Sequence, residues 1–253
     1  KMTTQHYYGC GMEEFMYLEK IQSPEDVKKL DVEQLKVLAG EMRQALIQKL
    51  SVHGGHVGPN LGMVEATIAM HYVFDSPKDK MVFDVSHQSY CHKMLTGRAD
   101  AFLDEAKYDD VSGYSEPSES AHDFFCIGHT STSVSLACGL AKARDLADEN
   151  YNVIAVIGDG SLSGGEALEG LDFAKELNGN LIVVVNDNEM SIAENHGGLY
   201  ENLKLLRDTK GQAECNIFKA MGLNYVFVED GNDLTHLKGS RILRRRLQCI
   251  SIH

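Results

Sequence analysis

The chain has 253 residues, 43% of them hydrophobic and 24% charged, which is typical of a globular protein with a sizeable core. Its formal net charge of −13 argues against nucleic acid or an anionic membrane surface as a partner, because clustered Lys and Arg recruit both. A membrane span needs roughly 18 consecutive apolar residues. Neither such a run nor the pattern of a secretory signal is present, so we expect a cytoplasmic protein. The six cysteines form no CxxC pair, which favours reduced thiols over disulfides or a zinc site.

The first 22 residues show no hydrophobic period, and we expect residues 1–22 to be a poorly ordered extension. Ser23, Pro24 and Asp26 then match a helix start, with a cap residue, a proline at the first helical position and an acid that can bond back to the cap. A longer helix should follow, because apolar residues are spaced to fall on one face. These residues are Leu35, Leu38, Met42, Leu46 and Leu50.

Glycine-rich loops and apolar segments alternate in the next part of the chain. The loop 53–60 should end the long helix, and the apolar residues 61–74 predict another helix. Residues 81–85 have the pattern of a short buried strand. A second glycine-led loop, 128–133, opens onto a predicted helix at 134–147.

The clearest alternation of strands and helices comes next. Residues 153–157 and 181–185 are continuous β-branched runs, as expected for parallel strands covered on both faces, and residues 166–177 predict the helix between them. We therefore predict an α/β fold, a doubly wound and mostly parallel sheet with helices on both faces. A polar linker, a helix at 213–221 and a strand at 225–228 complete a domain that we place at 23–237.

Residues 238–253 differ in character from the rest. Arg241, Arg244, Arg245 and Arg246 crowd into an otherwise acidic chain, and no turn or cap pattern ties them to what precedes. A basic docking tail is one interpretation. A truncation or frameshift is the hypothesis that we favour for this atypical tail.

Polar residues follow two successive predicted strands. Asp159 lies in the Gly-Asp-Gly sequence 158–160 after the first, and Asn188 lies in the loop after the second. Because parallel strands present their carboxyl ends at one edge of the sheet, these side chains should face each other. One carboxylate, one amide oxygen and a carbonyl near Met190 leave room for phosphate oxygens and water, the mixed shell that Mg²⁺ prefers. Gly-Asp-Gly alone is also an ordinary turn, so the Asn188 loop is what favours an ion and diphosphate site.

Four separated blocks, in the same order, resemble the amino-terminal domain of the 1-deoxy-D-xylulose-5-phosphate synthases, a family related to the transketolases. The blocks are GGHVGPNLG at 54–62, DVSHQSYCHK with LTGR at 84–98, GHTSTS at 128–133, and the GDG sequence with NDNEMSI at 186–192. The similarity extends from about residue 23 to residue 191. It implies a thiamine diphosphate-binding fold.

The resemblance implies that thiamine diphosphate and Mg²⁺ are the cofactors, with Asp159, Asn188 and the Met190 carbonyl as ion ligands. It implies that His56 and His87 face the thiazolium and the donor substrate, where they exchange protons near neutral pH, and that His87 also contacts the cofactor. The other implied cofactor contacts are Gly128, His129, Thr130, Gly158, Gly160, Ser161 and Asn188.

Simpler interpretations stay open for some of these residues. A histidine in a glycine-rich loop is often only solvated, and we expect this for His53 and His92. Thr130 and its neighbours have the composition of a helix cap. His87 and His92 are spaced like a metal pair, but no third ligand lies near them in sequence.

The resemblance implies condensation of pyruvate with glyceraldehyde 3-phosphate and loss of carbon dioxide, a step in isoprenoid precursor synthesis. Nothing in the sequence resembles the pyrimidine-binding domain, which in the family supplies the glutamate that activates the cofactor. We therefore expect half of an active site that needs a partner domain or subunit, and a homodimer like its relatives. Because 195–212 is short and 218–234 looks transketolase-like, a split transketolase subunit is an alternative. A non-catalytic subunit that keeps the fold is another.

Overall fold

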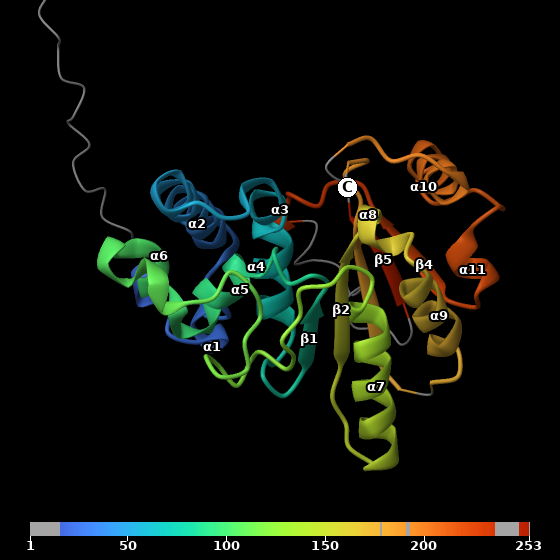
Figure 1. Cartoon of the computed structure of the whole chain (residues 1–253), viewed down its shortest axis with the longest axis horizontal. Helices are drawn as coiled ribbons and strands as arrows, with labels where there is room; N and C mark the ends of the chain where they lie inside the picture. Colours follow the sequence, from blue (N-terminus) through green and yellow to red (C-terminus); the bar gives the residue numbers. More distant parts are fainter. Residues whose placement is uncertain (1–15, 178, 191–192, 236–247, 253) are drawn as a thin grey trace, which may run out of the picture.

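A five-stranded parallel sheet forms the centre of the molecule, with the strand order β1-β2-β3-β5-β4 (Figure 1). The computed structural model describes residues 16–177, 179–190, 193–235 and 248–252. The strands are β1 (Lys80–Phe83), β2 (Val153–Gly158), β3 (Leu181–Asn186), β4 (Asn224–Val228) and β5 (Gln248–Ile252). All four neighbouring pairs are parallel, which confirms the predicted fold class.

Helices cover the sheet and form a separate layer beside β1 (Figure 1). The described α-helices are α1 (Pro24–Val27), α2 (Val32–His53), α3 (Val57–Leu61), α4 (Val64–Val73), α5 (Tyr90–Lys93), α6 (Asp100–Leu103), α7 (Ser133–Leu146), α8 (Asp159–Leu162), α9 (Gly165–Ala174), α10 (Gly198–Asp208) and α11 (Ile217–Ala220). Short helical turns of other types occupy Leu18–Lys20, Met94–Arg98 and Glu105–Asp110. None of these helices combines the length and apolar character that crossing a membrane requires.

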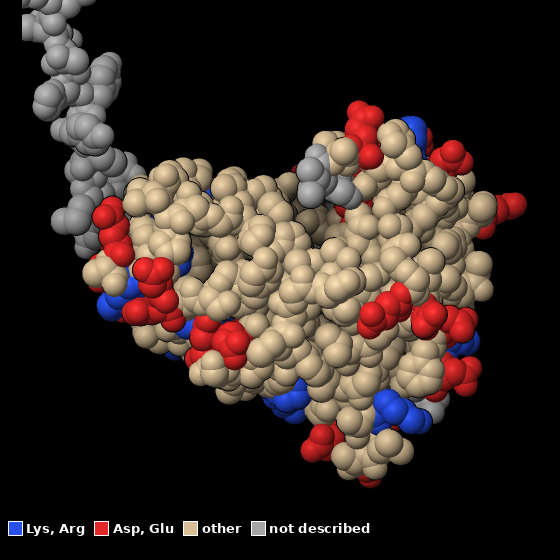
Figure 2. Space-filling view, viewed as in Figure 1, with Lys and Arg blue, Asp and Glu red and all other residues tan. Residues whose placement is uncertain are grey.

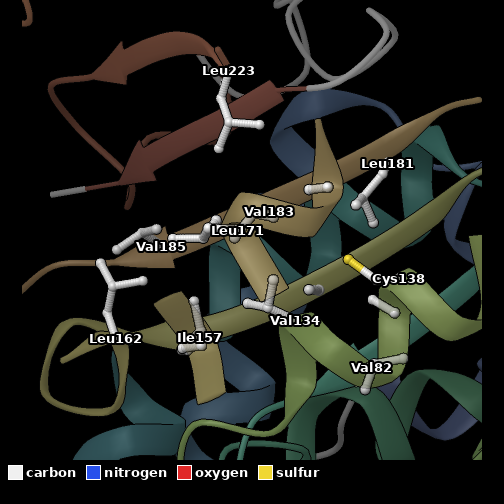
Figure 3. Packing of buried hydrophobic residues seen from close by; sticks show 14 of the residues in the cluster. Val82, Val134, Cys138, Ile157, Leu162, Leu171, Leu181, Val183, Val185 and Leu223 are labelled. Atoms are coloured by element: carbon white, nitrogen blue, oxygen red, sulfur yellow. The ribbon is translucent and has the colours of Figure 1, made fainter. Parts of the chain in front are cut away.

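Both faces of the sheet are buried at β1, β2 and β3, because alternate residues of these strands enter different hydrophobic clusters. Ile157 and Val183 pack in the cluster that includes Val134 and Cys138 of α7 (Figure 3). Ile154 on the opposite face packs in a cluster with Met63, Met70 and Phe74 around α4. Strands enclosed in this way carry apolar, mostly β-branched residues on both faces, which explains the continuous apolar runs in the sequence.

The helix-rich layer confirms the predicted pattern of α2. Its five predicted core residues are all buried, and the side chain of Asp26 accepts a hydrogen bond from the backbone N–H of Ser23 at 3.1 Å, as the predicted helix start requires. The structured part begins earlier than Ser23, however. Leu18 and Ile21 are buried in the same cluster as α2, because two apolar residues three apart are enough to dock one turn of chain.

Two further segments differ from the sequence-based expectation. The polar linker around 195–212 contains α10, whose Leu203 and Leu206 are buried while most of its other residues are exposed. The helix expected at 213–221 is confined to α11. The four arginines of the atypical tail lie outside the described residues, whereas 248–252 of that tail form β5 between β3 and β4.

The surface has no continuous basic patch among the described residues on the face shown in Figure 2, where Lys and Arg are scattered. The upper edge of this face is hollowed between the side that carries α2 and α3 and the side that carries α10 (Figures 1 and 2). The loops that follow β1, β2 and β3 reach this edge, as expected for ligand binding in an open parallel sheet.

Candidate functional site

The carboxyl ends of β2 and β3 lie side by side. Gly158 is paired with Asn186 in the parallel register, so the loops after these residues start at the same level of the sheet. Asp159, Asn188 and Met190 all line one cavity of about 500 Å³. The structure therefore places the three predicted ion ligands around one cavity at the edge of the sheet.

Asp159 carries an unusual carboxyl group. The Asp159 side chain is buried, with 2% exposure. This burial raises its pKa to about 6, and the nearby Asp187 carboxylate contributes to the rise. The side-chain amide of Asn195 donates a hydrogen bond to Asp159 Oδ2 at 2.8 Å. A buried carboxylate beside another carboxylate is costly unless a cation approaches it, and oxygen donors of this kind fit Mg²⁺. Among the described residues no cluster of three His, Cys, Asp or Glu side chains forms a metal site, so a cation here would depend on amide, carbonyl and external oxygens as well.

The two histidines predicted to face the substrate lie against each other. His56 precedes α3 and His87 follows β1, and their ring centroids are 5.3 Å apart in an edge-to-face arrangement. The Nδ1 atom of His56 lies 3.4 Å from the hydroxyl of Tyr90. Burial, and then the neighbouring His56, lower the pKa of His87, which keeps its imidazole neutral near pH 7. His87 Nδ1 is buried without a hydrogen-bond partner among the described residues.

Asn60 joins these two histidine loops and was not selected from the sequence. Its fully buried side chain donates to the carbonyl of His56 at 2.7 Å and to that of His87 at 2.8 Å. Its oxygen accepts the backbone N–H of Tyr90 at 3.0 Å. The sequence carries no clear signal for this role, because Asn is mostly an exposed residue and its burial here becomes visible only in the structure.

Asp84 fixes the glycine-led loop 128–133. Its two carboxylate oxygens accept the backbone N–H groups of Ser131 and Ser133 at 2.8 and 2.9 Å. The Ser131 hydroxyl in turn donates to the carbonyl of Ser161 in α8 at 2.9 Å. Three segments that carry predicted site residues, namely the end of β1, the loop 128–133 and α8, are therefore connected by direct hydrogen bonds.

The predicted cofactor contacts in this loop are open to solvent. Gly128, His129 and Thr130 are exposed, and His129 Nδ1 lies 2.7 Å from the carbonyl of Thr130. Gly160 and Ser161 are partly exposed and lie in α8, the short helix that follows β2. These residues could reach a bound molecule without any rearrangement of the buried core.

His92 does not line the cavity of the proposed ion site, and its ring nitrogens bind residues other than His87. Its ring is buried between His71, at 2.9 Å, and the Asp123 carboxylate, at 3.0 Å. Arg98 also binds Asp123, with Nη1 at 2.8 Å from Oδ2. His92 thus belongs to a buried polar network, in place of the solvated position expected from the sequence.

The fold itself resembles that of solved transketolases. A transketolase variant from Pichia stipitis has a TM-score of 0.64 and 18% sequence identity, and the match covers 85% of this chain and 35% of that one. A second transketolase structure from the same organism has a TM-score of 0.65 and 17% identity, with the same coverage. At such identity the likeness shows a shared fold.

Sequence similarity is more specific. The sequence model described as 1-deoxy-D-xylulose-5-phosphate synthase matches residues 18–214. The 1-deoxy-D-xylulose-5-phosphate synthase of Dictyoglomus turgidum is 53% identical over 192 residues, which is 76% of this chain and 31% of that protein. The synthase of Listeria monocytogenes is 43% identical over 238 residues, 92% of this chain and 39% of its own length. The chain belongs to the 1-deoxy-D-xylulose-5-phosphate synthase family, as its four sequence blocks predicted, and spans about a third of the length of these relatives.

Proposed function

We propose that this chain is the part of a 1-deoxy-D-xylulose-5-phosphate synthase that binds the diphosphate and Mg²⁺ of thiamine diphosphate. The observation that carries the proposal is the shared cavity lined by Asp159, Asn188 and Met190 at the ends of β2 and β3. In this proposal the Asp159 carboxylate, the Asn188 amide oxygen and the Met190 carbonyl hold the ion, and the ion holds the diphosphate. Binding of Mg²⁺ would favour the charged form of Asp159, which burial and Asp187 disfavour in its absence.

The remaining predicted contacts fit the same binding mode. Gly158, Gly160 and Ser161 would approach the diphosphate from the turn after β2, while Gly128, His129 and Thr130 would contact the middle of the cofactor. The exposure of the second group supports this part of the proposal. Thiamine diphosphate supplies the electron sink for decarboxylation of pyruvate when it is bound.

His56 and His87 are proposed to handle protons at the substrate. The lowered pKa of His87 leaves its imidazole neutral, so it can accept a proton from a hydroxyl or donate a hydrogen bond to a carbonyl oxygen. The edge-to-face contact with His56 and the Asn60 hydrogen bonds hold both rings close together. The substrates proposed are pyruvate and glyceraldehyde 3-phosphate, and the product serves isoprenoid precursor synthesis.

The proposal also includes a partner. Because the chain spans about a third of its relatives' length, the pyrimidine-binding domain implied by the resemblance would come from elsewhere. Its glutamate would be needed for catalysis, and loss of a group that acts together with the cofactor typically lowers rates by several powers of ten. A homodimer and a cytosolic location remain predictions from the sequence.

Calorimetric titration with thiamine diphosphate tests the binding proposal. We expect saturable binding that requires Mg²⁺ and is lost with EDTA or with the Asp159→Ala change. Asp172→Ala, which removes an exposed carboxylate from α9, serves as the control and should bind like the wild type. Binding by the wild type no tighter than by Asp159→Ala would reject the proposed function.

The substrates need a second experiment, in which the chain is supplied with the remainder of a family member. Release of carbon dioxide from pyruvate, stimulated by glyceraldehyde 3-phosphate, is the expected result. Strict dependence on a ketose phosphate donor would instead assign a transketolase activity. Cofactor binding without either reaction would favour a subunit that has kept the fold alone.

A further inference from the structure

Arg207 of α10 binds two side chains of the loop that carries Asn188. Its Nη1 lies 2.6 Å from Asp187 Oδ2, and its Nη2 forms an ion pair with the Glu189 carboxylate. One guanidinium therefore binds the residues immediately before and after Asn188. Arg207 also lines the cavity that contains Asp159 and Asn188. Sequence reasoning missed Arg207, because it lies in the segment interpreted as a linker.

The two ion pairs differ in burial. Asp187 is buried, with 3% exposure, so removing Arg207 would take a cation away from a buried carboxylate, which is destabilising. Glu189 is exposed and has a left-handed backbone conformation, with φ of +64°. This conformation is unfavourable for a residue with a side chain, and the ion pair to Arg207 offsets part of that cost.

The turn that Arg207 holds determines where the proposed ion ligands point. Within it, Asn188 Oδ1 accepts the backbone N–H of Met190 at 3.1 Å, so the amide oxygen and the Met190 backbone move as one unit. A planar guanidinium can bind two carboxylates at once in a fixed orientation, which a lysine ammonium on a flexible stem does less well. Fixing a loop before its ligand arrives reduces the ordering cost of binding.

We infer that Arg207 is a positioning residue for the divalent ion, holding the 187–190 turn so that Asn188 and the Met190 carbonyl face Asp159. This inference rests on the proposed function. Groups that orient metal ligands without touching the metal typically change metal affinity by about 10–100-fold when they are replaced. Arg207 has this relation to the ion ligands through Asp187 and Glu189.

The test is the Mg²⁺ concentration that half-saturates thiamine diphosphate binding, measured by calorimetry on the whole chain. Arg207→Met should raise this concentration about tenfold or more. Arg207→Lys should give an intermediate value, because lysine keeps the charge but cannot hold both carboxylates in the same geometry. Mn²⁺ binding followed by electron paramagnetic resonance gives a readout of the ion that does not depend on activity.

Lys210→Met is the matched control. Lys210 lies two residues after α10, does not line the cavity and pairs with exposed Glu229, so its loss removes one positive charge without releasing the turn. We expect it to bind Mg²⁺ within about twofold of the wild type, as is usual for an exposed pair. Thermal unfolding of each variant without ligand identifies the temperature range in which all are folded and comparable.

The possible failures are distinguishable. If the wild type binds no thiamine diphosphate, the proposed function is rejected and the inference is rejected with it. If the wild type binds and Arg207→Met needs no more Mg²⁺ than Lys210→Met, only the positioning role is overturned. Tighter Mg²⁺ binding by Arg207→Met would also overturn the positioning role. It would mean that the added attraction of an Asp187 carboxylate no longer paired with Arg207 outweighs any loss of order in the 187–190 turn.

Discussion

Asp84 Oδ1 accepts a hydrogen bond from the backbone N–H of Ser131 at 2.8 Å, across 47 positions of sequence. The other oxygen accepts the N–H of Ser133, so one buried carboxylate satisfies two backbone donors at the start of α7. Ser131 has a left-handed φ of +75°, which is uncommon for serine and is held by these bonds. Asp84 therefore stabilises a loop conformation that the chain would not adopt by local preference.

Replacing Asp84 by Asn tests this role. An amide offers one oxygen in place of two and turns an N–H₂ group toward a backbone donor, so we expect the free energy of unfolding to fall by about 1–3 kcal/mol. Chemical denaturation measures the change. Asp100→Asn, which alters only an exposed ion pair with Lys107, should stay within about 0.5 kcal/mol of the wild type. Equal effects of the two changes would contradict the role of Asp84.

Gly164 is required by contact with Ser131. A Cβ atom at this position would lie 1.9 Å from Ser131 Oγ and 2.5 Å from Ser131 Cβ. We expect Gly164→Ala to lower the free energy of unfolding by about 1–3 kcal/mol, as overpacking does, and to weaken cofactor binding. Gly165→Ala is the neighbouring control, since a Cβ there meets nothing within 4 Å and alanine stabilises helices by up to about 1 kcal/mol. A neutral Gly164→Ala in thermal unfolding would show that Ser131 can move aside.

The charged Asp159 side chain should destabilise the folded protein when no cation is bound. The rise of its pKa from 3.8 to about 6 corresponds to at most about 3 kcal/mol against the charged form. We expect Asp159→Asn to increase the free energy of unfolding at pH 8 by about 1–2 kcal/mol in EDTA, because the amide keeps an acceptor for Asn195 without the buried charge. The same variant should lose Mg²⁺-dependent cofactor binding. An unchanged or lower stability would mean that the carboxylate is well compensated by its neighbours.

The buried histidines predict a loss of stability in mild acid. Burial, followed by the charges of His92 and Arg98, lowers the pKa of His122 to about 4, and burial also lowers that of His71. The unfolded chain then takes up more protons than the folded one, so the free energy of unfolding falls as pH decreases from about 6.5 to 4. Asp159, with its raised pKa, opposes this trend below pH 6.

Denaturant unfolding at several pH values measures this dependence. His122→Asn should give a flatter profile, because the amide oxygen can replace Nδ1 as the partner of the Ser76 hydroxyl, which lies 2.8 Å away. An unaltered profile would assign the acid sensitivity to other groups. The measurement is independent of cofactor binding and so concerns the fold alone.

The elements with strong local patterns could be predicted from the sequence. The apolar face of α2 and the β-branched runs of β2 and β3 are determined by the residues inside each element, and the structure confirms them. The helix α10 was missed although Leu199, Leu203 and Leu206 have helical spacing, because the polar residues around it favoured a linker. Strand β5 was missed because nothing in 248–252 shows that the segment inserts between two earlier strands.

Some residues of the candidate site could be predicted from the sequence and others could not. Asp159 and Asn188 could be selected because each directly follows a recognisable strand, and the parallel register of β2 and β3 then brings them to one edge. Asn60, Asp84 and Arg207 could not be selected from the residues alone. Each acts on loops that are distant in sequence, as Asn60 does on His87 across 27 positions, so their roles become visible only in three dimensions.

The position of β5 has a consequence for how the protein folds. Because β5 lies between β3 and β4, neither of these earlier strands can complete its ladder until residues 248–252 arrive. A nascent chain on the ribosome would therefore present β3 as an open edge, and such edges template aggregation. The pairing of β3 with β5 joins residues 66 positions apart, as Ile182 and Gln248 are, and such non-local pairing is slow to form. Shielding of the open β3 edge by a chaperone should therefore matter more at this stage than the stability of the finished domain.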